Sequence, residues 1–482
     1  MLFNSIDFAI FLPIVFAVYW LLSKRDLRIQ NAWLLISSYV FYGWWDWRFL
    51  SLIALSTLVD YTAALRLRRD TASPSKFWLW VSLLVNLGLL GVFKYYGFFL
   101  DNLQEAFTFF GREVTFEGIE WVLPVGISFY TFQTLSYTLD VYRGKMEPSR
   151  DLVAFAAYVS FFPQLVAGPI ERASHLLPQI QKTRSFVYTQ ASDGVNQILW
   201  GLFKKLVIAD QSAVYVNYIF EHAHRMNPLQ LFAGAVLFAF QIYGDFSGYS
   251  DIAIGTARLF GIDLRQNFAF PYFSRDIAEF WRRWHISLST WFRDYLYIPL
   301  GGSRTSTVRV IRNTFIIFVV SGFWHGANWT FIFWGLAHAL LFIPLLLFGR
   351  NRRHLQVVAQ DRLLPRLSDL TRILLTFILV TLAWILFRAD SLAEAGAYYG
   401  GLLDWTKARG VVDPKDALSI LALSGMMILM IVVEWRGRRE LHALASWVQR
   451  SLWNQQVLRI CLVWIIILFM NTGQEDFIYF QF

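Results

Sequence analysis

Two histidines in this sequence lie where their side chains could do chemistry. His325 is inside residues 315–348, an apolar run with arginines beyond both ends. An ionisable side chain at membrane depth is costly, so its presence there favours a functional site. Gly322 and Gly326 flank it and would let a backbone or a ligand approach closely, and Asn328 adds a polar group. The alternative is a structural histidine, satisfied between packed helices.

The second histidine, His285, lies in an aromatic and basic stretch, residues 280–297. Apolar positions recur there at steps of three and four, which predicts one helical face made of Trp281, Trp284, Leu288, Trp291 and Tyr295. Arginines lie off that face, as is typical of a helix in the membrane interface. A sharper hypothesis adds that His285 flanks the aromatic face and that Arg282, Arg283 and Arg293 hold phosphates.

A third candidate contains two carboxylates, Asp245 and Asp251, six positions apart among serines and glycines. Such a pair suits general acid–base chemistry or a cation site. The simpler interpretation, which we favour at this point, is a loop that turns on glycine and places one aspartate as a helix cap.

The composition indicates a membrane protein. Of the 482 residues, 56% are hydrophobic and 16% are charged, whereas soluble domains carry roughly 25% charged residues. The net charge of +9 does not indicate nucleic acid, because the basic residues lie in loops between apolar runs. The single cysteine, Cys461, permits neither a disulfide nor a cysteine metal cluster within the chain, and we interpret it as a helix-packing residue. We expect no metal site.

Apolar runs recur from end to end, which predicts an all-α polytopic membrane protein with a single membrane domain over residues 1–482. We expect roughly 11–13 transmembrane or re-entrant helices and interfacial amphipathic helices. Prolines and a glycine in 161–169 predict a re-entrant segment there. The arginine-rich segment 263–312 is expected to be cytosolic or interfacial. No positive region precedes the first apolar run, and basic loops alternate with acidic ones, so both termini should lie outside.

Several long motifs resemble those of the membrane-bound O-acyltransferase family. Within it they are similar to the bacterial alginate O-acetyltransferase subgroup, and the resemblance covers nearly the whole chain in the right order. The motifs are PVGISFYTFQ at 124–133, FFPQLVAGPI at 161–170, YGDFSGYSDIAIG at 243–255, FWRRWHISLS at 280–289, SGFWHG at 321–326 and FIYFQF at 477–482.

The resemblance implies that His325 is the catalytic histidine and His285 a supporting one. Acyl transfer to a hydroxyl needs a base, and a buried, neutral histidine meets that need. It also needs hydrogen-bond donors for the oxyanion, which Asn328, backbone N–H groups near Gly326, or His285 could supply. Residues expected to bind the substrate or the donor are Arg282, Arg283, Arg293, Trp324 and Asn328.

The resemblance further implies an acetyl transfer in the bacterial inner membrane. The donor would be cytosolic acetyl-coenzyme A, a substrate rather than a bound cofactor. The acceptors would be hydroxyls of an exported polysaccharide, alginate, reached through periplasmic carrier proteins. Expected partners are thus the bilayer, donor, carriers and polymer, but no nucleic acid. Cellulose or another envelope glycan stays open, as does a scaffold with a vestigial site. A secondary transporter is the alternative from another class, since broken helices also suit one.

Overall fold

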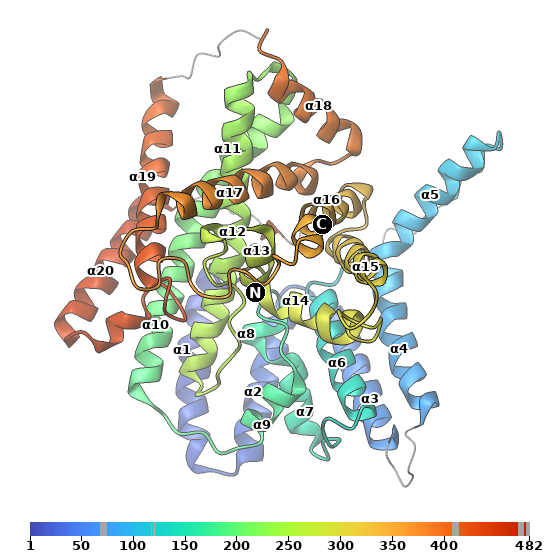
Figure 1. The fold of residues 1–482 in the computed structure, drawn as a ribbon. Helices are drawn as coiled ribbons and strands as arrows, with labels where there is room; N and C mark the ends of the chain where they lie inside the picture. Colours follow the sequence, from blue (N-terminus) through green and yellow to red (C-terminus); the bar gives the residue numbers. More distant parts are fainter. Residues whose placement is uncertain (68–74, 117, 119–121, 407–413, 471–476, 479–482) are drawn as a thin grey trace. The chain divides into compact units, whose positions relative to one another are not determined.

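The protein is almost entirely helical. A computed structural model describes residues 1–67, 75–116, 118, 122–406, 414–470 and 477–478, and within these ranges every regular element is a helix (Figure 1). Nine helical stretches in the described ranges are long and apolar enough to cross a membrane. The predicted all-α polytopic membrane protein is therefore confirmed. Of the motif at 477–482, residues 479–482 lie outside the described ranges.

The chain divides into two compact units. The first comprises Met1–Val187 and Phe260–Leu264, and the second comprises Tyr188–Leu259 and Arg265–Phe482. The expected single membrane domain over residues 1–482 stays a prediction. Both candidate histidines and both candidate aspartates belong to the second unit.

The first unit contains helices α1 to α9. They are α1 (Ile6–Leu21), α2 (Leu27–Gly43), α3 (Leu50–Leu67), α4 (Lys76–Leu90), α5 (Tyr96–Phe109), α6 (Ile127–Tyr142), α7 (Leu152–Ser160), α8 (Phe162–Leu165) and α9 (Ala173–Ile180). The helix is interrupted within 161–169, because α7 ends at Ser160 and the backbone of Phe161 leaves helical geometry before the short α8. That this segment re-enters the membrane stays a prediction. The buried carboxylate of Asp60 is satisfied by hydrogen bonds from Ser82, Asn86 and Thr138.

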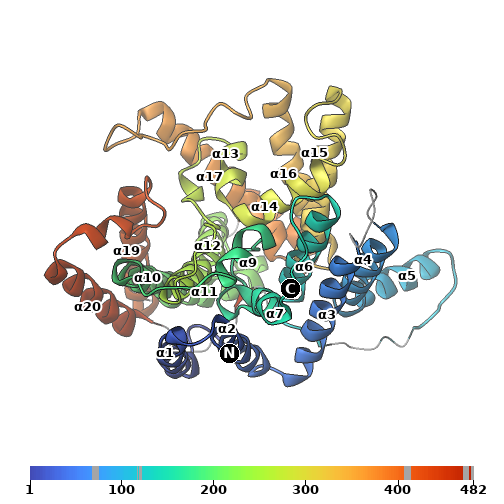
Figure 2. The ribbon, with the colours of Figure 1, turned by 90° about the horizontal axis from the view of Figure 1, so that it is seen from below.

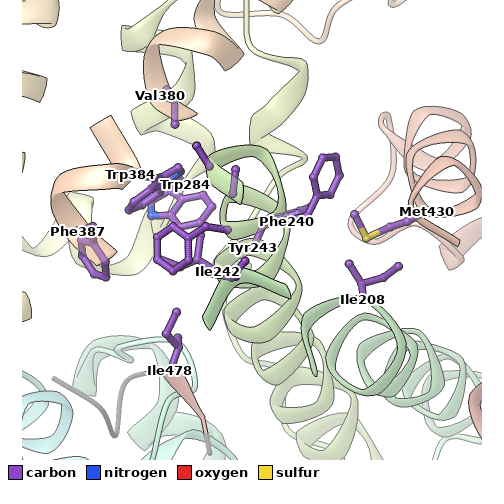
Figure 3. Close-up of a cluster of buried hydrophobic side chains, with 14 of the residues drawn as sticks. Ile208, Phe240, Ile242, Tyr243, Trp284, Val380, Trp384, Phe387, Met430 and Ile478 are labelled. Atoms are coloured by element: carbon purple, nitrogen blue, oxygen red, sulfur yellow. The ribbon is translucent and has the colours of Figure 1, made fainter. Parts of the chain in front are cut away.

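The second unit contains helices α10 to α20 and a buried aromatic core. The helices are α10 (Tyr188–Leu202), a π-helical stretch (Phe203–Ala209), α11 (Asp210–Glu221), α12 (Pro228–Leu259), α13 (Ile277–Arg283), α14 (Ile286–Phe292), α15 (Thr307–His325), α16 (Trp329–Leu347), α17 (Leu367–Arg388), α18 (Leu392–Leu403), α19 (Pro414–Gly437) and α20 (Leu452–Phe469). In the core, Trp384 packs on Trp284 at a ring-centroid distance of 5.0 Å (Figure 3). It also packs on Trp334 at 5.4 Å.

The prediction of a glycine turn around Asp245 and Asp251 is wrong, because α12 runs unbroken through 32 residues. Its glycines serve close helix packing instead, with α12 running beside α10 (Figure 2). A Cβ at Gly248 would come within 2.7 Å of the Gly201 carbonyl oxygen, so glycine is required where the backbones meet. Neither aspartate caps a helix. Asp245 pairs with buried Lys205 at 2.9 Å, and Asp251 pairs with buried Lys204 at 2.6 Å.

The prediction of one amphipathic helix over 280–297 is also wrong. The helix breaks between α13 and α14, where His285 has a left-handed φ of 44°. A backbone hydrogen bond from Ile286 N–H to the Asn267 carbonyl holds this break. Trp284, Trp291 and Tyr295 are all buried rather than arranged along one interfacial face.

Candidate active site

His325 is the last residue of α15, and the turn after it is short. The backbone of Gly326 is extended, and α16 begins at Trp329 with Asn328 as its N-cap. The His325 side chain is 3% exposed. The apolar run at 315–348 therefore forms a helical hairpin that holds the imidazole at its turn.

Glycines near His325 allow the two helices of the hairpin to touch. A Cβ at Gly322 would lie 2.1 Å from the Phe331 carbonyl oxygen, and a Cβ at Gly335 would lie 2.2 Å from the Phe318 carbonyl oxygen. At Gly326 a Cβ would meet the Phe331 ring at 2.0 Å. Of the two roles considered from the sequence, close backbone approach is the one that these glycines have.

Aromatic rings enclose His325. The ring centroids of Trp324, Trp334 and Phe387 lie 5.0, 5.2 and 5.4 Å from the imidazole centroid. The His285 ring is 6.3 Å away. The two histidines that the sequence singled out, 40 positions apart, are thus brought together, and predicted Trp324 packs against both rings.

An amide that sequence reasoning missed holds His285. His285 is fully buried, and its Nδ1 lies 3.2 Å from Oδ1 of Asn267. The same oxygen accepts hydrogen bonds from the backbone N–H and the hydroxyl of Ser287. On its other side, Asn267 Nδ2 donates to the Ser250 hydroxyl of α12 at 3.1 Å. No spacing rule marks Asn267, because its role depends on a contact formed only in the folded chain.

These contacts determine the tautomer of His285. The Ser287 N–H can only donate, so the Asn267 atom that it meets must be the carbonyl oxygen. His285 Nδ1 must then carry the proton and donate to that oxygen, which leaves Nε2 as the acceptor nitrogen. Burial lowers the pKa of His285 to about 3, so the ring is neutral at physiological pH. A neutral ring in this tautomer accepts at Nε2, which does not fit the oxyanion-donor role considered from the sequence.

Asn328 is engaged at the start of α16. Its side-chain oxygen accepts from the Thr330 N–H at 3.0 Å, and its amide nitrogen donates to the Asp390 carbonyl at 2.9 Å. The amide therefore caps the helix and ties it to the end of α17. Its part in binding a substrate stays a prediction.

The three arginines predicted to hold phosphates have different surroundings. Arg282 donates to the backbone carbonyls of Asn351 and His354 at 2.7 and 2.8 Å. Arg283 pairs with buried Glu279 at 2.9 Å. Arg293 has a side chain that is 59% exposed, and it pairs with the adjacent Asp294 at 2.7 Å. Arg282 and Arg283 thus hold α13 in place, and Arg293 is the one most accessible to a ligand.

His338 occupies a separate, buried position on α16. The Trp281 indole N–H donates to its Nδ1 at 3.3 Å. The Trp334 ring contacts both His325 and His338, at centroid distances of 5.2 and 5.0 Å. His338 is thus a packed neighbour of the site behind Trp334, with a hydrogen bond of its own.

Comparisons with known proteins show which family this chain resembles. The family model of the membrane-bound O-acyltransferase family matches residues 147–384, which include both histidines and Asn267. A probable alginate O-acetylase AlgI from Pseudomonas syringae pv. tomato is 38% identical, over 90% of this chain and 80% of its own. Its counterpart in Pseudomonas aeruginosa is also 38% identical, over 92% and 82%. A peptidoglycan O-acetyltransferase from Helicobacter pylori is 33% identical, over 100% and 98%.

Proposed function

The chain belongs to the membrane-bound O-acyltransferase family, and from that premise we propose that it transfers acetyl groups towards hydroxyls of an exported polysaccharide, alginate. The observation that carries the proposal is the buried imidazole of His325 at the turn of the α15–α16 hairpin, with the buried imidazole of His285 at a ring-centroid distance of 6.3 Å. As an O-acyltransferase the protein is an enzyme, so the alternative of a secondary transporter is set aside.

His325 acts as the general base. Its imidazole takes the proton of the acceptor hydroxyl, whose oxygen then attacks the acetyl carbonyl. The carbon–sulfur bond of the thioester breaks, and the leaving thiolate receives the proton back from His325. The aromatic rings around His325 exclude water from the imidazole. His285 contributes a fixed acceptor nitrogen that orients a hydroxyl or the His325 ring.

The donor is acetyl-coenzyme A from the cytosol, and the acceptor comes from the opposite side. The arginine-rich segment 263–312 supports a cytosolic approach for the polyanionic donor, because positive charge marks the inner face. The protein resides in the bacterial inner membrane and passes the acetyl group to periplasmic carrier proteins. Both chain termini lie on the periplasmic side.

The proposal has a second candidate for the polymer that is acetylated. Relatives named as alginate O-acetylases are 38% identical, which supports alginate. The peptidoglycan O-acetyltransferase is matched along 98% of its own length at 33% identity, which supports an envelope glycan of that kind. Cellulose is the other alternative raised from the sequence.

A deletion experiment tests the proposal. The gene is deleted in its own host, and acetyl esters are measured separately on exported polysaccharide and on peptidoglycan. Loss from the exported polymer, restored by the wild-type gene but not by His325→Ala, supports alginate-type acetylation. Loss from peptidoglycan alone selects the second candidate. Unchanged esters on every envelope polymer would contradict both.

A further inference from the structure

The second unit contains a wide apolar groove that the reaction does not use. It lies between α12, α17 and α19 and has a volume of about 640 Å³, within the range of roughly 300–1,000 Å³ that ligand pockets occupy. Its walls include Phe240 of α12, Leu374 and Phe377 of α17, and Val432 of α19. Figure 3 shows Phe240 on α12 and Met430, another lining residue, on α19.

The walls of this groove are suited to hydrocarbon. Leu374 and Val432 are 51% and 47% exposed, and Leu364 in the loop before α17 is 71% exposed. Both α17 and α19 are among the stretches able to cross a membrane. Apolar surface of this extent at membrane depth is filled by acyl chains rather than by water.

The polar groups at the floor of the groove already have partners. The Tyr243 hydroxyl lies 3.0 and 2.9 Å from the two carboxylate oxygens of Glu434. Lys204 lies 3.9 Å from the same carboxylate. These polar groups at the floor of the groove therefore need no hydrogen-bond partner from a ligand.

One cation at the groove is available to a ligand. Arg436 lines the groove one helical turn beyond Val432 and is exposed. Among the described residues, none makes a hydrogen bond or ion pair with its guanidinium. By contrast, Arg438 and Arg439 are bound to backbone carbonyls of the loop before α17. A guanidinium beside an apolar groove matches an amphiphile with a phosphate head.

We propose that this groove binds an anionic phospholipid of the bilayer, with an acyl chain along α17 and α19 and the phosphate at Arg436. Trp435, next to that arginine, donates its indole N–H to the Leu363 carbonyl at 2.8 Å and fixes the loop at the mouth. Tryptophan and arginine together are typical of the headgroup level of a membrane.

The bound lipid would also support the active site. The Tyr272 ring lines the groove and contacts Phe377 and Trp284, at centroid distances of 5.1 and 6.1 Å. Trp284 directly precedes His285. An acyl chain in the groove thus packs against the aromatic layer behind the second histidine. The binding itself does not depend on which acyl group or polymer the enzyme uses.

Photolabelling in lipid nanodiscs tests the proposal. The full chain is reconstituted in phosphatidylcholine with a phosphatidylglycerol probe that carries a diazirine in its acyl chain, and labelled peptides are mapped by mass spectrometry. We expect labels on α17 and α19, and about tenfold less labelling in Leu374→Trp, which fills the groove. Leu375→Trp is the matched control, because Leu375 is 59% exposed on the same helix but does not line the groove.

The headgroup contact is tested separately, with a variant that leaves the core untouched. Arg436→Gln should lower labelling by the phosphatidylglycerol probe to the level of a phosphatidylcholine probe, whereas Arg353→Gln, at another exposed arginine, should not. Equal labelling of Leu374→Trp and Leu375→Trp would overturn the proposal. So would displacement of the probe by palmitoyl-coenzyme A but not by unlabelled phosphatidylglycerol, since the groove would then hold a soluble acyl donor.

Discussion

His325 and His285 are both buried, but different neighbours decide what each ring can do. His325 is enclosed by the rings of Trp324, Trp334 and Phe387. His285 is held by the Asn267 amide, which fixes its proton on Nδ1. A ring surrounded by apolar faces can exchange a proton with a substrate, whereas a ring fixed by an amide is better suited to orienting one. This difference supports the proposal that His325 is the base.

Replacing His325 by alanine should abolish transfer while the protein accumulates normally. General base catalysis contributes about 10²–10⁴-fold, so the rate of coenzyme A release should fall at least a hundredfold. The control is His338→Ala, at a buried histidine behind Trp334. That change leaves the Trp281 N–H without its acceptor and should cost about 1–3 kcal/mol of stability, with most of the specific activity kept. Normal ester formation by His325→Ala would end the assignment of the base.

Asn267 should act as a positioning residue, visible in the pH dependence. Asn267→Ala removes the oxygen that orients His285 and should lower kcat by about tenfold or more. Asn267→Asp keeps an acceptor there but adds a negative charge, which favours imidazolium and raises the pKa of His285. Activity of this variant should therefore fall as pH is lowered through the raised pKa. In the wild type, His285 has a pKa of about 3 and is neutral above that pH. Protonation of His285 should therefore cause no loss of wild-type activity in the pH range above its pKa.

Two observations separate this role from a merely structural one. Ser287→Ala removes only one of the donors to the Asn267 oxygen and should leave the pH profile unchanged. If Asn267→Asp and the wild type showed the same pH profile, Asn267 would not govern the protonation of His285. In that case the amide would serve only to hold the chain break between α13 and α14.

At the scale of elements, the sequence marked 315–348 as an apolar stretch around His325 but did not predict α12. That stretch is a continuous apolar run, which is a local signal, and in the structure it forms most of α15 and α16. In α12 the glycines resemble turn signals, but they serve contacts with α10 that no local pattern reveals. The same limit applies to the break at His285, because its left-handed φ is stabilised by Asn267, 18 positions earlier. The two histidines could thus be predicted from their surroundings in the chain, whereas Asn267 could not.

The arginines around α13 and α14 should divide into two classes. Arg282→Gln combined with Arg283→Gln removes bonds to the carbonyls of Asn351 and His354 and leaves buried Glu279 with one partner fewer. We expect less protein in the membrane and an unchanged donor KM in what remains. Arg293→Gln should instead raise donor KM more than it lowers kcat, since a remote phosphate contact is largely uniform binding.

Measuring donor KM in detergent without anionic lipid distinguishes these classes, because headgroup effects are then absent. The contact at Arg293 should also weaken with salt, since exposed charges are screened within roughly 8–10 Å at moderate ionic strength. If the double variant had a raised donor KM at normal protein levels, Arg282 and Arg283 would be the residues that bind the donor. An unchanged KM in Arg293→Gln would remove this arginine from the donor site.

At the scale of the whole molecule, charge rather than packing predicts how the chain lies in the membrane. Basic residues follow the first apolar run, where Lys24, Arg25 and Arg28 lie, and acidic residues gather after α5. Cytoplasmic loops carry an excess of lysine and arginine, so this alternation places the first loop inside. The orientation is thus a prediction from the charge pattern of the sequence. It decides on which side the donor meets segment 263–312.

Cysteine labelling of intact cells tests this orientation. Cys461 is exposed and is first replaced by serine, so that each variant carries one thiol. In that background Glu113→Cys, at an exposed position after α5, should react with a membrane-impermeant maleimide. Arg25→Cys, equally exposed, should react only after the inner membrane is permeabilised. The opposite labelling pattern would mean that the chain has the inverse orientation in the membrane. Segment 263–312 would then lie on the periplasmic side, where cytosolic acetyl-coenzyme A could not reach Arg293.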